Sequence, residues 1–103
     1  MKKCITRVWH GLIKATDKDT YGQYVIDTGI ADYKSIPGNL GVKMMFRLEG
    51  ELCHIYTVSE WDSYESIKAF AGQDYELARY YPEDSKFLLE KEKLVQHYET
   101  IRF

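Results

Sequence analysis

The sequence predicts a single α+β domain whose strands and helices follow the order β-α-β-β-α-β. Its 103 residues fit one domain of ordinary size. Hydrophobic residues at 45% and charged residues at 29% are typical of a globular chain. Segments in which apolar residues alternate with period two are separated by segments in which they recur at helical spacing. We therefore treat residues 1–103 as one domain.

The first strand and the first helix are predicted from the first third of the chain. Residues 4–13 (CITRVWHGLI) are rich in β-branched and aromatic side chains, which favours a strand. Residues 16–19 (TDKD) match a capping box, and apolar residues follow it at helical spacing. Gly29 is expected to end this helix, with one short extra turn within residues 30–36.

A β-hairpin is predicted next. Apolar side chains alternate with period two along residues 39–49, which indicates a second strand. The short turn Glu49-Gly50-Glu51 then joins it to a third strand at about residues 52–60.

A second helix and a last strand complete the pattern. The helix is expected to start after a cap at Ser63 and, after an interruption at Gly72, to continue up to Pro82. The last strand spans about residues 93–101. This is the order of the split βαβ, or ferredoxin-like, fold. Its right-handed crossovers place both helices on one face of a four-stranded antiparallel sheet.

Both faces of this sheet carry apolar side chains. The two sides of the first strand present Thr6, Val8, His10 and Leu12, and Ile5, Arg7, Trp9 and Ile13. Two helices cover only one face, so the other face needs a second cover. The simplest cover is a second copy of the same sheet, and we therefore expect a homodimer.

Charge and hydropathy argue against several partners. The net charge is −2 and no basic stretch is longer than Lys2-Lys3, so nucleic-acid binding is not expected. No apolar run approaches the roughly 18 residues of a membrane span. Thr6 and Arg7 interrupt the region where a secretory signal would be apolar. We expect a cytoplasmic protein that binds neither nucleic acid nor membrane.

The cysteines and histidines give no sign of a disulfide or a metal site. Cys4 and Cys53 begin strands that are antiparallel neighbours in this topology, so they should lie at opposite ends of the sheet as free thiols. The three histidines are scattered and no CxxC pair exists, so no metal is expected.

Several segments, in order and spacing across nearly the whole chain, resemble a subgroup of antibiotic biosynthesis monooxygenase domains. They are Arg7-Val8-Trp9-His10-Gly11, Pro37-Gly38-Asn39-Leu40-Gly41, Trp61-Asp62-Ser63, residues 67–74 (IKAFAGQD), Tyr80-Tyr81-Pro82-Glu83-Asp84 and His97-Tyr98-Glu99. The resemblance implies a dimeric α+β barrel with a cavity between each sheet and its own helices. It also implies oxygenation of polycyclic phenols without metal or flavin, so no cofactor is expected. In such a reaction the substrate loses a proton and the resulting anion reacts with oxygen.

Four residues are candidates for substrate binding. Trp9 and Trp61 could form the walls around an aromatic ligand, although indoles in strands often belong to the core. Asn39 could hold a substrate carbonyl, or it could serve the turn that precedes it. Arg7, in the middle of a strand, requires either a carboxylate partner in the protein or an anionic ligand.

His97 is the candidate catalytic base, because an imidazole with an ordinary pKa near 6.5 accepts protons at neutral pH. A histidine that only hydrogen-bonds its neighbours is the alternative. The acidic run Pro82-Glu83-Asp84 is interpreted as solvated surface.

The resemblance leaves three functions open after haem degradation, a fourth, is set aside. The haem-degrading branch of the family places an Asn on the first strand, a Trp in the second helix and a His ten residues later. Here the first strand has no Asn, and Phe70 and Tyr80 occupy the other two positions, which argues against haem. The leading hypothesis is a small oxygenase for an aromatic or quinone-like molecule. The alternatives are a non-catalytic module that binds such a molecule, and a structural dimer whose cavity is filled by its own side chains.

Overall fold

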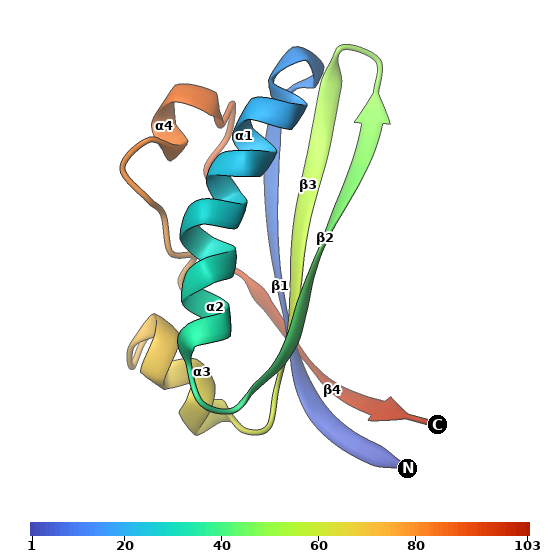
Figure 1. Cartoon of the computed structure of the whole chain (residues 1–103), viewed down its shortest axis with the longest axis vertical. Coiled ribbons are helices and arrows are strands. Elements are labelled where there is room, and N and C mark those ends of the chain that lie inside the picture. The colour runs from blue at the N-terminus through green and yellow to red at the C-terminus, as the bar shows by residue number, and fades with distance from the viewer.

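A computed structural model of residues 1–103 shows a four-stranded antiparallel sheet with helices on one face, the ferredoxin-like α+β fold that the sequence predicts (Figure 1). The strand order is β2-β3-β1-β4, and each neighbouring pair is antiparallel. The strands are β1 (Lys2–Lys14), β2 (Asn39–Glu49), β3 (Leu52–Trp61) and β4 (Gln96–Arg102). No helix is both long enough and apolar enough to cross a membrane.

The first helical region is longer than predicted. After a 3-10 turn, η1 (Ala15–Asp17), it runs without a break through α1 (Lys18–Val25), a π-helical segment η2 (Ile26–Ile30) and α2 (Ala31–Ser35). The expected helix end at Gly29 is wrong, because Gly29 is buried within η2 and does not take the positive φ that ends helices. The predicted capping box is not formed either, since no side chain caps this helix.

The second helical region is shorter than predicted. Its first helix, α3 (Tyr64–Ala71), starts at Ser63, whose hydroxyl accepts a hydrogen bond from the Ser66 amide at 3.3 Å. It ends at Gly72, where φ is 89°. The predicted continuation to Pro82 is wrong, and only a single turn follows, α4 (Asp84–Phe87).

Residues 72–83 form an irregular segment between α3 and α4. The amide of Ala78 donates to the Lys93 carbonyl at 2.8 Å, and the amide of Val95 donates to the Glu76 carbonyl at 2.9 Å. These long-range hydrogen bonds take the backbone groups that a helix would use, so local helical spacing does not prevail here. They also explain why β4 starts at Gln96 and not at the predicted residue 93.

The helices cover one face of the sheet and leave the other bare (Figure 1). Alternate residues of β1, among them Arg7 and Trp9, face the helices and are buried. Gly11 makes room for the indole of Trp9, because a Cβ at Gly11 would lie 2.6 Å from the indole ring and 2.9 Å from Leu88. The strand therefore needs glycine at this position.

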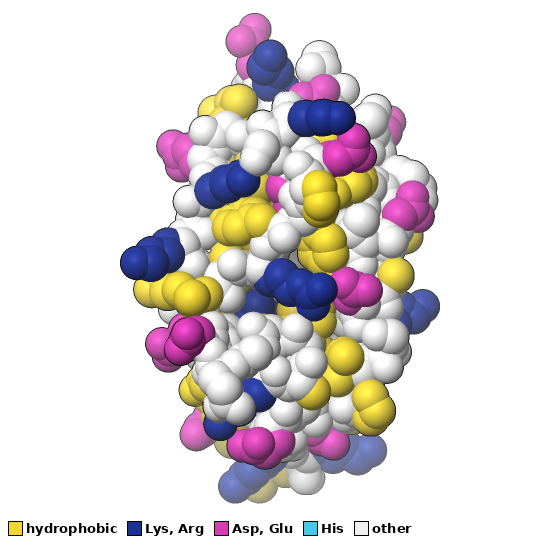
Figure 2. All heavy atoms as spheres, turned by 90° about the vertical axis from the view of Figure 1, so that its left-hand side faces the viewer, with side chains coloured by type: hydrophobic (Ala, Val, Ile, Leu, Met, Phe, Trp, Pro, Cys, Tyr) yellow, Lys and Arg dark blue, Asp and Glu magenta, His cyan; other side chains and the backbone are white.

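The core between sheet and helices has two parts. One part surrounds Trp9 and Tyr21 near α1, and the other surrounds Trp61 and Phe70 near α3. Side chains of both parts border the cavity described below, so the cavity lies where the two parts meet. On the outer surface of the helix layer, hydrophobic atoms lie in small groups among charged side chains (Figure 2).

The two cysteines are free and buried, as predicted. Cys53 pairs with Ile13 in the register between β1 and β3, while Cys4 lies near the other end of β1. At roughly 3.4 Å per strand residue, they are far beyond the roughly 7 Å limit for a disulfide.

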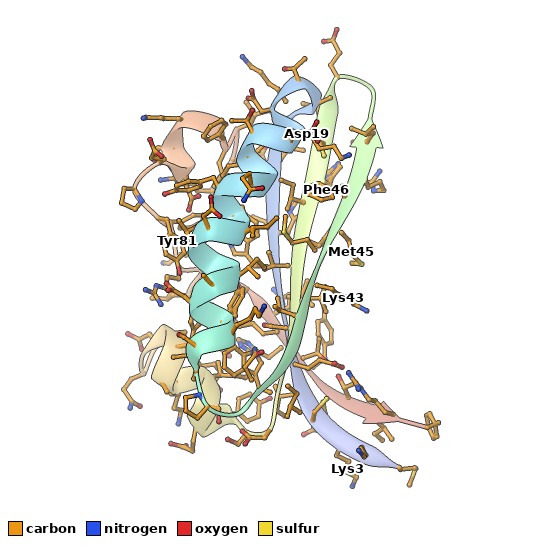
Figure 3. The ribbon with its side chains drawn as sticks, in the orientation of Figure 1. Lys3, Asp19, Lys43, Met45, Phe46 and Tyr81 are labelled. Carbon is orange, nitrogen blue, oxygen red and sulfur yellow. The ribbon has the colours of Figure 1, made fainter.

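The bare face of the sheet is part apolar and part charged. Lys43 and Met45 of β2 point away from the helices (Figure 3). At the centre of the bare face, Val8 of β1 and Val58 of β3 are direct cross-strand partners, and neither is fully buried. Tyr98 of β4, 53% exposed, lies on the same side. This face remains our proposed site of self-association.

Gel filtration with light scattering tests this proposal. We expect the wild-type chain to have twice the 12.1 kDa mass of one chain. The substitution Val58→Lys should give a monomer, because it places a charge at the centre of the interface, where a buried unpaired charge is costly. Ile26→Lys, a similar change at an exposed residue of the helix layer, is the control and should stay dimeric. A stable wild-type monomer at micromolar concentration would contradict the proposal.

Candidate functional site

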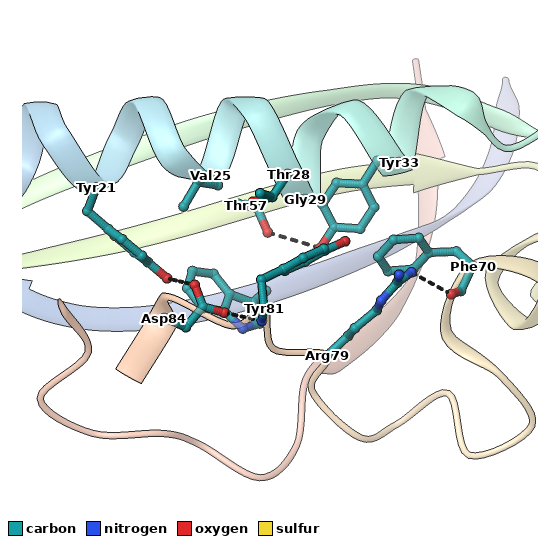
Figure 4. Close-up of a pocket in the computed structure, with 11 residues that line it drawn as sticks. Tyr21, Val25, Thr28, Gly29, Tyr33, Thr57, Phe70, Arg79, Tyr81 and Asp84 are labelled. Carbon is teal, nitrogen blue, oxygen red and sulfur yellow. Dashed lines mark hydrogen bonds between the residues drawn. The ribbon is translucent and has the colours of Figure 1, made fainter. Parts of the chain in front are cut away.

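A small cavity lies between the helix-facing side of β1 and β3, the helix run from Lys18 to Ser35, and the irregular segment after α3 (Figure 4). About 30 Å³ is open to the centres of water-sized molecules. That is space for one or two waters, not for an aromatic ring. Thr28 and Gly29 of the π-helical segment form part of its wall. Such π segments often occur at functional sites.

One end of the cavity holds a buried carboxylate. Asp84, the first residue of α4, is 3% exposed. One oxygen, Oδ1, accepts a hydrogen bond from the Tyr21 hydroxyl at 2.8 Å, and Oδ2 accepts one from the Tyr81 amide at 2.6 Å. Burial, together with this hydrogen bond to Asp84, raises the pKa of Tyr21 well above its ordinary value. Tyr21 therefore stays protonated and acts as a donor to Asp84.

The opposite end holds a guanidinium group that ties the irregular segment to the rest of the protein. Arg79 donates from Nη1 to the Phe70 carbonyl at 3.1 Å, and its Nη2 lies 3.4 Å from Oδ2 of Asp32 on α2. The Tyr81 hydroxyl donates to the same carboxylate oxygen at 2.5 Å. Burial and this bond raise the pKa of Tyr81. Asp32 thus fastens two side chains of the segment over the cavity.

Aromatic rings form the walls between these two ends. The rings of Tyr33 and Phe70 lie 4.5 Å apart between centroids. The hydroxyls of Tyr33 and Thr57 are 3.3 Å apart. Trp9 borders the cavity as well, and its indole Nε1 is buried without a hydrogen-bond partner. A buried N–H without an acceptor is rare in native proteins, and a bound water or a ligand atom is one way to satisfy it.

No protein-family model matches the sequence, and no curated protein matches it. Solved structures share the fold at low identity. Rv0793 from Mycobacterium tuberculosis is 9% identical with a TM-score of 0.58, covering 99% of this chain and 96% of that one. PA3566 from Pseudomonas aeruginosa is 14% identical with a TM-score of 0.59, covering 100% and 97%. A Bacillus cereus protein, provisionally assigned as an antibiotic biosynthesis monooxygenase, is 13% identical over 95% and 88%, but its TM-score of 0.48 carries no argument. These likenesses concern the fold alone.

The structure places the predicted substrate-binding residues at different depths. Trp9 borders the cavity. Trp61 is fully buried behind it, with its Nε1 donating to the Ser59 hydroxyl at 2.9 Å. Asn39 is paired with Trp61 at the start of β2, away from the cavity wall, and its Nδ2 is buried without a partner. Of the two tryptophans and the asparagine, only Trp9 is in position to touch a molecule in the cavity.

The predicted base, His97, lies beside the cavity and not in its wall. It faces the helices from β4, with Nε2 3.3 Å from Nη1 of Arg7 and its ring next to those of Tyr64 and Tyr75. Burial, and then the positive charge of Arg7, lower the pKa of His97 to about 4. His97 is therefore uncharged at neutral pH and a weaker proton acceptor than an ordinary histidine.

The other two histidines lie on the bare face of the sheet. Nε2 of His10 is 2.9 Å from Nδ1 of His54, and the two rings are stacked. His54 contacts Glu49 at 3.0 Å, and His10 contacts Glu92. This row of side chains is separated from the cavity by the thickness of the sheet.

The interpretation of Pro82-Glu83-Asp84 as solvated surface is wrong for Asp84. The carboxylate is buried because Tyr21, 63 residues away in sequence, and the Tyr81 amide enclose it. In the sequence, the only local sign that the Asp84 carboxylate is buried is the aromatic residue Tyr81 three positions before it, and this sign is weak. Sequence reasoning also missed Tyr33 and Arg79, whose positions depend on how the irregular segment packs.

Proposed function

We propose that the protein binds a small aromatic molecule in this cavity and acts on it as a cofactor-independent monooxygenase. The observation that carries the proposal is the buried carboxylate of Asp84 in the wall of an otherwise largely aromatic cavity. A carboxylate held in an apolar enclosure can accept a proton from a bound molecule.

The walls suit an electron-rich aromatic anion. Trp9, Tyr33 and Phe70 offer ring faces and edges to a planar ligand. The unpartnered Nε1–H of Trp9 and the hydroxyls of Tyr33 and Thr57 can donate to a developing negative charge on oxygen. These donors are held by packing, so they cost little reorganisation when the charge forms.

The chemistry requires molecular oxygen as the second substrate. For an anthrone-type compound, one C–H proton passes to Asp84 and leaves a carbanion stabilised by the rings. A C–O bond forms between this carbon and oxygen, and the resulting peroxide anion takes the proton back from Asp84 to give a hydroperoxide. Loss of the second C–H proton and cleavage of the O–O bond then give the ketone and water. The ring carbon is oxidised by four electrons and oxygen is reduced by four.

Entry of an aromatic ring requires the irregular segment to move, because about 30 Å³ holds no ring. The side chains that close the cavity, Arg79 and Tyr81, belong to this segment and are both held by Asp32. Residues 72–83 contain no helix or strand, so among backbone hydrogen bonds a shift of this segment has to break only those to Lys93 and Val95.

A second candidate is a module that binds the aromatic molecule without transforming it. Asp84 already accepts two hydrogen bonds, from Tyr21 and from the Tyr81 amide. Each of its two oxygens is therefore already engaged by a donor of the protein itself. This observation favours binding without proton transfer.

Binding and oxygen uptake with anthrone and a naphthohydroquinone separate these candidates. Calorimetry reports binding of each compound, and an oxygen electrode reports turnover against the rate of spontaneous oxidation without protein. We expect both binding and oxygen uptake above that rate. Tight binding without added oxygen uptake would support the non-catalytic module, and no binding of either compound would contradict both candidates.

A further inference from the structure

The least compensated charge in the protein is Arg7, next to the cavity. Its side chain is 1% exposed, and no carboxylate lies within ion-pair distance of it. Both of its hydrogen-bond contacts use Nη1, which donates to the Tyr75 carbonyl at 2.7 Å and lies 3.3 Å from His97. Its Nε is buried without any acceptor. One side of the guanidinium group is therefore unused.

A buried guanidinium group without a counter-charge is costly. Removing a charge from water costs several kcal/mol even after the protein relaxes, and only a partner of opposite charge offsets this. Here burial lowers the pKa of Arg7 and the neighbouring Arg79 acts in the same direction, whereas the Tyr33 hydroxyl opposes them without outweighing burial. The Phe70 ring, 5.5 Å from the guanidinium carbon, gives only weak compensation. An uncompensated guanidinium group in such a place is therefore expected to bind an anionic group.

Arg7 lies directly beside the walls of the cavity. Tyr33 and Phe70 both border the cavity. The Phe70 ring centroid lies 5.5 Å from the guanidinium carbon of Arg7, and Tyr33 is close enough to act on the pKa of Arg7. Arg79 lies over the same Phe70 ring at 4.8 Å. Of these two guanidinium groups only Arg79 has a carboxylate, that of Asp32. Arg7 does not itself line the cavity, but it places one uncompensated positive charge directly behind the wall at this end.

The two ends of the cavity thus differ in charge. Figure 4 shows Tyr21 and Asp84 at one end and Arg79 and Phe70 at the other. A ligand that fits this arrangement has an anionic group toward the arginines and a neutral or proton-donating group toward Asp84. The planar fork of a guanidinium group matches a carboxylate in geometry.

We infer that the natural ligand is an aromatic carboxylic acid whose carboxylate lies at the Arg7 end of the cavity. The inference rests on the proposed function, because it takes the cavity as the binding site. It adds the charge of the ligand and its direction in the cavity. Arg7 would then bind the ligand and not take part in proton transfer.

Calorimetric titration with a matched pair of probes tests the inference. The pair is 2-naphthoate, which is anionic, and 2-naphthamide, which is neutral and has almost the same shape. Wild-type protein should bind the naphthoate at least about tenfold more tightly, as expected for a charge-assisted hydrogen bond. In Arg7→Met this preference should disappear while the affinity for the amide stays within about twofold. Arg7→Lys, which keeps the charge without the fork, should retain part of the preference.

Two further measurements serve as controls for this titration. Arg47→Met removes an exposed arginine from the bare face and should keep the wild-type preference. The Tm of ligand-free Arg7→Met should equal or exceed that of wild type, because the variant removes a buried unpaired charge. A Tm well below wild type would show that Arg7 is needed for folding and would contradict the inference.

The outcomes also separate this inference from the proposed function. Equal binding of the two probes by wild type, or an unchanged preference in Arg7→Met, would overturn the carboxylate and leave an aromatic binding site in place. Failure of both probes to bind would contradict the cavity as a binding site and the inference with it.

Discussion

Replacement of Trp61 by alanine is expected to lower the free energy of unfolding by about 3–5 kcal/mol. Trp61 is fully buried at the end of β3 and packs against Tyr33 and Phe70, with ring centroids 6.1 and 6.0 Å away. Its loss would leave a cavity in the second part of the core and remove the hydrogen bond to Ser59. No neighbour can fill so large a space without shifting the sheet or α3.

Urea unfolding followed by circular dichroism measures this effect. It should be repeated at several protein concentrations, because self-association would add to the apparent stability. Trp61→Phe is the matched control, since it keeps most of the ring volume and should cost clearly less than the alanine variant. A loss below about 1 kcal/mol for Trp61→Ala would mean that the indole is not a core residue. Trp61 would then regain its claim as a wall for a ligand.

Trp61 also shows why residue type alone does not identify a site. From the sequence, Trp9 and Trp61 are both predicted to lie on strands, and both are equal candidates for the wall of a ligand site. The structure separates them, because one borders the cavity with a free Nε1–H and the other is enclosed with its Nε1–H already bonded. That difference depends on which side chains from distant segments surround each ring.

The strands follow from sequence, whereas the segment that closes the cavity does not. Period-two alternation predicts residues 39–49 as the structure has them, and the other three strands, predicted mainly from residue type and position, agree to within three residues. Alternation is strong because one face of the sheet is buried and the other is not. By contrast, residues 72–83 have helical spacing but bond to residues 93–95 instead. Local spacing cannot anticipate such long-range pairing.

The candidate site was predicted only in part for the same reason. Arg7 and Trp9 stand on a strand whose faces can be assigned by alternation, so their inward direction was foreseeable. Asp84 and Arg79 stand on irregular or short elements, where sequence offers no direction for a side chain. Their partners, Tyr21 and Asp32, are 63 and 47 residues away. When the partners of a charged residue are so far away in sequence, tertiary packing decides whether that residue is buried.

Replacement of Asp84 by asparagine is expected to lower the rate of oxygen uptake by roughly 10²–10⁴-fold if Asp84 accepts the substrate proton. Asparagine keeps the size of the side chain but cannot act as a base. The Tyr21 hydroxyl and the Tyr81 amide bind different oxygens of Asp84, so in the asparagine variant one of these two donors would face the NH2 group and lose its acceptor. The main loss should therefore be in kcat, with a smaller effect on KM. Asp27→Asn, at an exposed position of the same helix layer, is the control.

His97→Ala decides between the two proposed bases. His97 does not border the cavity and its pKa is near 4, so this variant should retain most of the turnover if Asp84 is the base. A loss of 10²-fold or more in His97→Ala, with Asp84→Asn close to wild type, would move the reaction to the space beside Arg7 and His97. Normal turnover in both variants would mean that the protein supplies no base from either position. Oxygenation, if observed, would then depend on a substrate that ionises without help, and the cavity would act by shape and by the donors of its walls alone.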